Sequence, residues 1–233
     1  MKERGMIFNG EMVRALLDGR KTQTRRIMKV QPEPSKSRPG DFWFSSKKLE
    51  SMVHVSDLAP GNSPIVDCHL FFQEHCCPFG AVGDRIWVRE AFRVHSRATD
   101  VATLVYKASE RNSWTEQTHR VPVAVCNKPA TPEKWTPSLH MPRWASRITL
   151  EITDVRVERL NSISEEDATA EGVPPAGSLL PDYQGTFLTP NGDFATAKVA
   201  FQRLWESIYG EDSWKANPWV WVIKFKRIEG GAE

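Results

Sequence analysis

The amino-acid sequence predicts a mixed α+β domain built on a small, barrel-like sheet. Three observations support this fold class. Short apolar runs recur along the chain, and residues 148–157 show the clearest alternation of apolar and polar positions. Two segments have helical periodicity, one near each end of the chain. A length of 233 residues without internal repeats suits a single domain, 1–233, that carries insertions.

The N-terminal part is expected to fold as strand, helix and strand. Residues 6–8 form a short apolar strand, and Asn9 can cap a helix over about 10–18 that Gly19 ends. The polar stretch 20–27 carries two threonines that suit a second strand. Proline then interrupts the pattern, so we expect an insertion at about 30–80 with only short local structure.

The remaining elements alternate between strands and helices. Ser164 is expected to cap a helix with acidic residues in its first turn, and this helix ends at Gly172. A second insertion rich in proline and glycine lies at about 173–195. The other expected elements are strands at 83–90, 102–106, 121–125, 148–157 and 219–227 and a helix at 195–209.

Composition excludes several classes of protein. Hydrophobic residues make up 40% and charged residues 26%, which is too apolar for a disordered chain. The longest apolar run, residues 219–223, is far shorter than the roughly 18 residues of a membrane span. Residues 1–5 lack the apolar stretch of a signal peptide. We therefore expect a cytoplasmic protein that does not contact membranes.

Net charge is close to neutral, but its distribution is uneven. The formal charge of +2 argues against a basic surface that coats nucleic acid. Residues 1–30 carry 8 Lys/Arg against 3 Asp/Glu, whereas residues 151–172 carry 2 against 7. Either run could be a solvated face, and together they could form one small polar cleft.

The cysteines follow no CxxC spacing, and without an export signal they are expected to be reduced. One cluster could hold zinc, and it consists of Cys68, His69, His75, Cys76 and Cys77. The alternative is that these cysteines are small buried apolar side chains. We predict no metal and no cofactor.

The basic segment after Gly19 has the residue types of a reactive or anion-binding site. Lys21 follows a helix-ending glycine, and Thr24 and Arg26 share one strand face because they are two residues apart. If Lys21 is partly buried beside Arg26, its ammonium form is disfavoured, and it could act as a base towards Thr24 or a water. The same residues could instead hold a phosphate.

The stretch Gly19-Arg20-Lys21-Thr22-Gln23-Thr24-Arg25-Arg26 resembles the Gly-x-Lys-x-x-[Glu/Thr]-x-Arg signature of ASCH domains, which belong to the PUA-like superfamily. The order of elements and the stretch 140–147 also resemble longer ASCH proteins of phages and prophages. The resemblance covers residues 1–30, 80–107, 138–172 and 195–228. It implies a PUA-like, mostly antiparallel β-barrel with flanking helices and two loop insertions. It also implies a cleft for a nucleobase, nucleoside or nucleic-acid segment.

The resemblance implies an activity as well. Small ASCH proteins include amidohydrolases that deacetylate acetylcytidine with a Lys, a Thr and a Glu beside an Arg. Lys21, Thr24 and Arg26 match that motif, and Glu171 matches the glutamate at the end of the similar segment 160–171. Lys21 would remove a proton from Thr24 or a water, Arg26 would stabilise the oxyanion, and Glu171 would pass the proton to the leaving amine. The alternative is that Glu171 forms a structural ion pair with Lys21 or Arg26.

Four other residues are candidates for binding the substrate or a nucleic acid. Arg143, Trp144 and Arg147 could stack a base and grip a phosphate, or Trp144 could be core. Glu90 could line the same cleft or pair with an arginine. The predicted function is an amidohydrolase of an N-acylated pyrimidine nucleoside such as acetylcytidine. The alternatives are a non-catalytic module that binds RNA or single-stranded nucleic acid, and a nuclease, although the sequence shows no acidic metal cluster.

Overall fold

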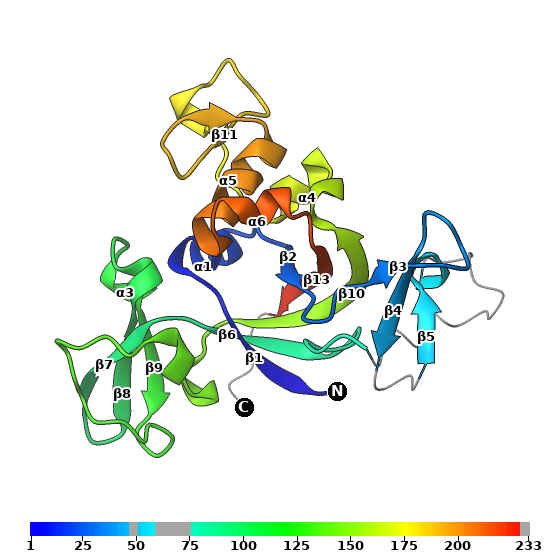
Figure 1. The fold of residues 1–233 in the computed structure, drawn as a ribbon. Helices are drawn as coiled ribbons and strands as arrows, with labels where there is room; N and C mark the ends of the chain where they lie inside the picture. Colours follow the sequence, from blue (N-terminus) through cyan, green and yellow to red (C-terminus); the bar gives the residue numbers. More distant parts are fainter. Residues whose placement is uncertain (47–50, 59–75, 229–233) are drawn as a thin grey trace. The chain divides into compact units, whose positions relative to one another are not determined.

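The computed structural model describes residues 1–46, 51–58 and 76–228, and confirms a mixed α+β chain (Figure 1). The chain divides into two compact units. Unit 1 contains residues 1–19 and 84–151 and the chain from Arg227, and unit 2 contains residues 20–83 and 152–226. The largest sheet has the order β1-β6-β10-β13-β2, which leaves β1 and β2 as edges over the described ranges. These strand pairings form an open sheet, so the PUA-like barrel stays a prediction.

In unit 1, strand β1 (Glu3–Ile7) runs parallel to β6 (Arg85–Arg89), and β6 pairs antiparallel with residues 149–151 of β10 (Thr149–Arg159). Helix α1 (Gly10–Leu17) follows β1. The Asn9 side chain accepts a hydrogen bond from the Met12 amide at 2.8 Å, and this confirms the expected cap.

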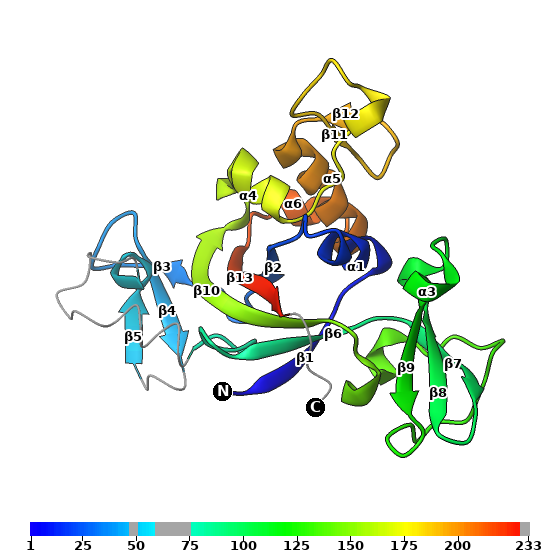
Figure 2. The same ribbon diagram turned by 180° about the vertical axis from the view of Figure 1, so that it is seen from behind.

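A second sheet of unit 1 contains β7 (Phe92–Arg97), β8 (Val101–Tyr106) and β9 (Thr118–Pro122), all antiparallel, with the short helix α3 (Trp114–Gln117) before β9 (Figure 2). Its core includes Phe92, Leu104, Tyr106 and Met141, all fully buried. The strand expected at 121–125 lies three residues earlier because residues 122–126 form a turn, in which the Val125 amide donates to the Pro122 carbonyl.

In unit 2, the rest of β10 is followed by α4 (Glu165–Ala170), α5 (Ala197–Tyr209), α6 (Asp212–Lys215) and β13 (Trp219–Ile228). Strand β2 (Gln23–Ile27) pairs antiparallel with β13. The three helices pack on this part of the sheet through a core that includes Leu160, Phe201, Trp205, Val220 and Val222. The apolar run that predicted β13 is buried in this core, but the stripe that predicted α5 (Val199, Leu204, Trp205 and Ile208) is only partly so. Trp205 is buried and Leu204 packs against the core, whereas Val199 and Ile208 are exposed and Ala197, Ala200 and Phe201 take the buried positions.

Both expected insertions contain strands. Strands β3 (Glu33–Pro34), β4 (Phe42–Ser46) and β5 (Ser51–His54) form a three-stranded sheet, and β11 (Phe187–Leu188) pairs with β12 (Phe194–Ala195). The first sheet is held partly by aromatic contacts, since the Trp43 and His54 rings lie 3.6 Å apart. The aromatic run Phe42-Trp43-Phe44 was not predicted as a strand, because the prolines of this segment indicated a loop. No helix of the described chain is long and apolar enough to cross a membrane.

Candidate functional site

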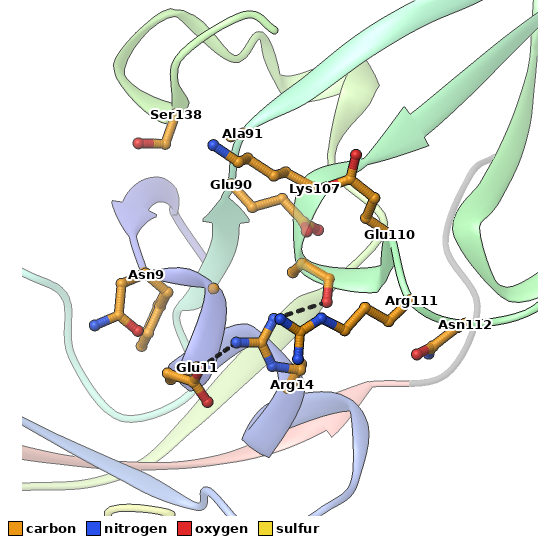
Figure 3. Close-up of a pocket in the computed structure, with 13 residues that line it drawn as sticks. Asn9, Glu11, Arg14, Glu90, Ala91, Lys107, Glu110, Arg111, Asn112 and Ser138 are labelled. Carbon is orange, nitrogen blue, oxygen red and sulfur yellow. Dashed lines mark hydrogen bonds and ion pairs between the residues drawn. The ribbon is translucent and has the colours of Figure 1, made fainter. Parts of the chain in front are cut away.

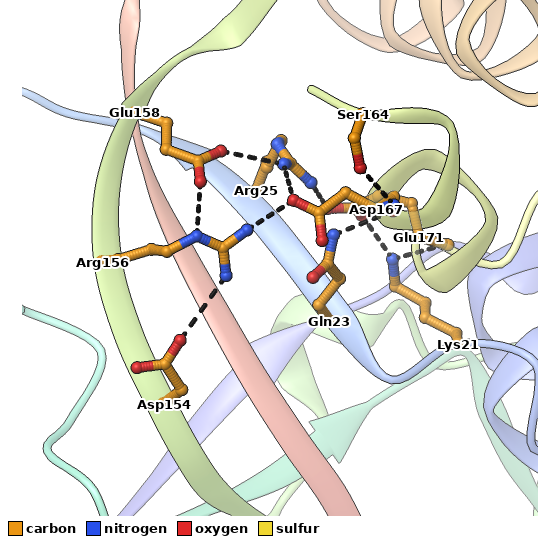
Figure 4. Close-up of polar contacts among 9 residues, drawn as sticks. All are labelled: Lys21, Gln23, Arg25, Asp154, Arg156, Glu158, Ser164, Asp167 and Glu171. Atoms are coloured by element: carbon orange, nitrogen blue, oxygen red, sulfur yellow. Dashed lines mark hydrogen bonds and ion pairs between the residues drawn. The ribbon is translucent and has the colours of Figure 1, made fainter. Parts of the chain in front are cut away.

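Lys21 lies in a buried site of unit 2, where it contacts Glu171 (Figure 4). Its ammonium donates to the Glu171 carboxylate and to the Glu171 backbone carbonyl, both at 2.8 Å. Lys21 is only 3% exposed and Glu171 2%. Two of the three residues predicted to be catalytic are therefore in direct contact and shielded from water.

Three consecutive residues hold this contact in place. Arg20 Nη1 donates to the Gly172 carbonyl at 2.7 Å, Lys21 Nζ to that of Glu171, and the Thr22 amide to that of Ala170 at 2.9 Å. These carbonyls lie at the C-terminal end of α4, where helical carbonyls lack partners within the helix. The segment before β2 therefore caps α4, and this cap fixes where Lys21 and Glu171 meet.

Helix α4 presents Glu171 because its two ends are well defined. The Ser164 side chain accepts from the Asp167 amide at 3.1 Å, which confirms the predicted N-terminal cap. At the other end Gly172 has a φ of +89°, a conformation that favours glycine and ends the helix. Glu171 is thus the C-cap residue of α4, directly before Gly172.

Arg25 connects this contact to a larger set of charges. One Arg25 nitrogen donates to Glu171 Oε1 at 3.1 Å, and the other donates to Asp167 at 2.9 Å and to Glu158 at 3.1 Å. Arg156 in turn contacts Glu158 and Asp167, and lies 3.5 Å from Asp154. We call this set the Lys21–Glu171 network, and its members are Lys21, Arg25, Asp154, Arg156, Glu158, Asp167 and Glu171.

Strand alternation separates the predicted residues into two faces of β2. Arg25 and Gln23 share the face towards α4, where the Gln23 side chain donates to the Asp167 carbonyl at 2.8 Å. Thr24 and Arg26 lie on the opposite face; Thr24 is buried and Arg26 is partly buried. The arginine that contacts Glu171 is therefore Arg25, which the sequence interpretation did not select.

Burial lowers the pKa of Lys21, because a charged ammonium is costly away from water. Glu171 opposes this shift, whereas the positive charges of Arg26 and Arg25 lower the pKa further. The net direction is downward. Lys21 therefore gives up its proton more readily than an exposed lysine, as a general base requires.

No protein-family model, curated protein or solved structure matches the chain. The resemblance to ASCH domains thus stays a prediction from the motif. The proposed function rests on that motif and on the chemistry of the Lys21–Glu171 network. The motif and the network share Lys21, and Glu171 is the buried partner of Lys21.

Asp167 makes the stability of the network dependent on pH. Burial alone would raise the pKa of Asp167, but Arg156 and Arg25 lower it below its usual value. Because the pKa of Asp167 is lower in the folded chain than its value of 3.8 in the unfolded chain, ionised Asp167 stabilises the fold above pH 3.8. This contribution is lost as the pH falls through the lower pKa of the folded chain.

We expect Asp167→Asn to lower the free energy of unfolding by about 1–3 kcal/mol at pH 7 and by less near pH 3. Urea unfolding at both pH values measures this, and an equal loss at both would contradict it.

The four other candidates lie in unit 1, and the structure does not gather them into one cluster. Arg147 binds the Glu90 carboxylate through two nitrogens, at 2.9 and 3.0 Å, and lies 4.0 Å from the centre of the Tyr106 ring. Glu90 is 2% exposed, and burial raises its pKa although Arg147 lowers it. Glu90 is thus the partner of an arginine, one of the two roles that the sequence left open.

Arg143 and Trp144 have separate partners. Arg143 Nε donates to Glu3 at 2.9 Å, near the surface. Trp144 packs against the core of the β7-β8-β9 sheet, edge-on to the Phe92 ring at 6.2 Å. Among the described contacts, Arg143, Trp144 and Arg147 therefore have different main partners: Glu3, the core of the β7-β8-β9 sheet and Glu90.

The possible zinc cluster falls mostly on residues that the structure does not describe, since Cys68, His69 and His75 lie outside the described ranges. Cys76 is partly buried and Cys77 is buried. Within the described part of the chain, no three His, Cys, Asp or Glu side chains are grouped as metal ligands would be.

Proposed function

We propose that this chain is an ASCH-type protein with a PUA-like barrel that hydrolyses an N-acylated pyrimidine nucleoside such as acetylcytidine. The observation that carries the proposal is the buried contact between Lys21 Nζ and Glu171 Oε2 at 2.8 Å. The motif supplies the substrate class, and the contact supplies a base and a proton carrier. No cofactor is required for this chemistry.

The proposed reaction uses water as the nucleophile, and it requires a local opening that admits water and substrate, because the Lys21 side chain has no exposed surface in the structure. Lys21, as the free amine, takes a proton from water, and the hydroxide oxygen bonds to the acyl carbon. The bond from that carbon to the exocyclic nitrogen then breaks, and the proton passes through Glu171 to the leaving nitrogen. Acetate and cytidine are the products. Water is favoured over Thr24 because the alternation of β2 turns Thr24 to the face opposite Arg25.

Arg26 is proposed to approach the acyl oxygen of the substrate, whereas Thr24, which is buried on the same face of β2, has no assigned step. They share the second face of β2, and the charge of Arg26 acts on Lys21. A guanidinium next to the acyl oxygen stabilises the negative charge that develops there. Arg25 is held by three carboxylates, so its role is to position Glu171.

The test is hydrolysis of acetylcytidine, followed as release of cytidine. We expect turnover by the unaltered protein and a loss of kcat/KM of roughly 100-fold or more in Lys21→Met, because general bases contribute about 10²–10⁴-fold. Lys215→Met is the matched control, since Lys215 is 81% exposed and lies in the same unit. Circular dichroism establishes that each variant is folded. Absent turnover, or full activity in folded Lys21→Met, would refute the proposal.

The two alternative functions receive less support from the described contacts. A module that binds RNA or single-stranded nucleic acid would need Arg143, Trp144 and Arg147 to face a ligand, and these residues contact Glu3, the core and Glu90. A nuclease would need a metal cluster or a metal-independent mechanism. Salt-sensitive RNA binding without acetylcytidine turnover would favour the binding module.

A further inference from the structure

Unit 1 contains a pocket that the proposed hydrolase site does not use (Figure 3). Its volume is about 740 Å³, within the range of roughly 300–1,000 Å³ typical of small-molecule sites. The lining comes from residues 8–11 and Arg14 around the start of α1, from Glu90 and Ala91 directly after β6, from the segment 107–112 and from Ser138. All of these residues belong to unit 1.

Two cationic side chains on these walls have no partner among the described residues. Lys107 and Arg111 are exposed, and neither makes an ion pair or a side-chain hydrogen bond to another residue that the structure describes. Arg14, a third cation in the wall, is held by Glu11 and by the Ala108 carbonyl at 3.0 Å. Lys107 and Arg111 can therefore bind a ligand without breaking an existing ion pair.

Glu90 gives the pocket a buried acceptor. Each carboxylate oxygen accepts one hydrogen bond from Arg147, and a carboxylate oxygen can accept more than one. Arg147 balances the charge of Glu90, and Arg14 balances that of Glu11. The lining therefore keeps two cations, Lys107 and Arg111, against one exposed carboxylate, Glu110. The pocket thus combines free cations with a buried acceptor for a hydrogen-bond donor.

We infer that this pocket is a second binding site, for a phosphorylated small molecule that carries a hydrogen-bond donor. Arg111 offers the planar fork that binds phosphate oxygens, and Lys107 adds a mobile point charge. The volume exceeds that of a phosphate ion and leaves room for an organic group that reaches Glu90. The site differs from the proposed hydrolase centre in its residues, its unit and its ligand.

Calorimetric titration of the whole chain with phosphoethanolamine, inorganic phosphate and ethanolamine tests this inference. Phosphoethanolamine carries both a phosphate and an ammonium donor. We expect it to bind at millimolar concentration or better, more tightly than phosphate, with ethanolamine weakest. Lys107→Gln/Arg111→Gln should weaken phosphoethanolamine binding by roughly tenfold or more, because two charge-assisted contacts are lost.

Arg120→Gln is the matched control. Arg120 is exposed on β9, outside the pocket, and should change affinity by less than about twofold, as expected for a distant surface charge. Thermal unfolding checks that all three proteins are folded. No binding by the unaltered chain, or equal weakening by Arg120→Gln and the double variant, overturns the inference. Equal affinity for phosphate and phosphoethanolamine would show that the ammonium group of the ligand does not donate to Glu90, and would overturn that part of the inference.

Discussion

Glu171→Ala should lower the free energy of unfolding by about 3–5 kcal/mol, the typical cost of leaving a buried charge unpaired, because Lys21 would lose its carboxylate while Arg25 would keep Asp167 and Glu158. The carboxylate binds Lys21 and Arg25, whose side chains have no exposed surface, so neither cation could turn to water without a local rearrangement. Urea unfolding at pH 7 measures the loss. Glu211→Ala, an exposed position in the same unit, should change the free energy by less than about 0.5 kcal/mol.

A double replacement separates stability from activity at this site. Lys21→Met/Glu171→Leu removes both charges and fills the space with apolar atoms, which is often neutral or stabilising for a buried pair. We expect it to be more stable than Glu171→Ala and inactive on acetylcytidine. A double variant as unstable as Glu171→Ala would show that the contacts of Arg25, and not Lys21, dominate the loss.

Arg147→Met should lower the free energy of unfolding by about 3–5 kcal/mol at pH 7, because the Glu90 carboxylate would be left buried without its cation. The loss should shrink as the pH falls. The pKa of Glu90 is already raised by burial, and without Arg147 it rises further. Protonated Glu90 is neutral and tolerates burial, so its contribution to stability is fully present below pH 4.5, the pKa of the unfolded chain. This contribution is lost as the pH rises through the higher pKa of Glu90 in the folded chain.

Unfolding of Arg147→Met at pH 7 and pH 4.5 measures this dependence. Arg143→Met is the matched control, since Arg143 and its partner Glu3 are 37% and 36% exposed, and surface pairs contribute about 0–1 kcal/mol. Arg143→Met should show no pH-dependent loss in the free energy of unfolding. A loss in Arg147→Met that is the same at both pH values would mean that packing against Tyr106 matters more than the ion pair.

Local signals in the sequence predicted the elements of the site well. Asn9 and Ser164 cap their helices as predicted, because capping depends on residues within one turn. The strand at 148–157 and the C-terminal strand were predicted from apolar patterning and differ from the structure by two residues or fewer at each end. Of these elements, α4 and β10 carry residues of the Lys21–Glu171 network, and β13 pairs with β2, which carries Arg25.

The sequence could not predict which arginine contacts Glu171. Arg25 and Arg26 are neighbours of the same type, and their roles depend on which face of β2 meets α4. That choice is made by tertiary packing, here by the cap that residues 20–22 form on α4. The pocket of unit 1 was missed for a similar reason. Its walls come from segments far apart in sequence, and no motif relates Lys107 and Arg111 to Glu90.

The cap on α4 also has a consequence for folding kinetics. Lys21 and Glu171 are separated by 150 positions, and the hydrogen bonds of Arg20 and Thr22 span similar distances. Contacts between such distant residues require a large loop to close before they contribute, which slows folding. Lys21 should therefore remain an ordinary hydrated lysine in any partly folded chain, and should lose its water only in the final docking step. Reactivity towards an amine-modifying reagent during refolding would fall at Lys21 together with the appearance of native structure.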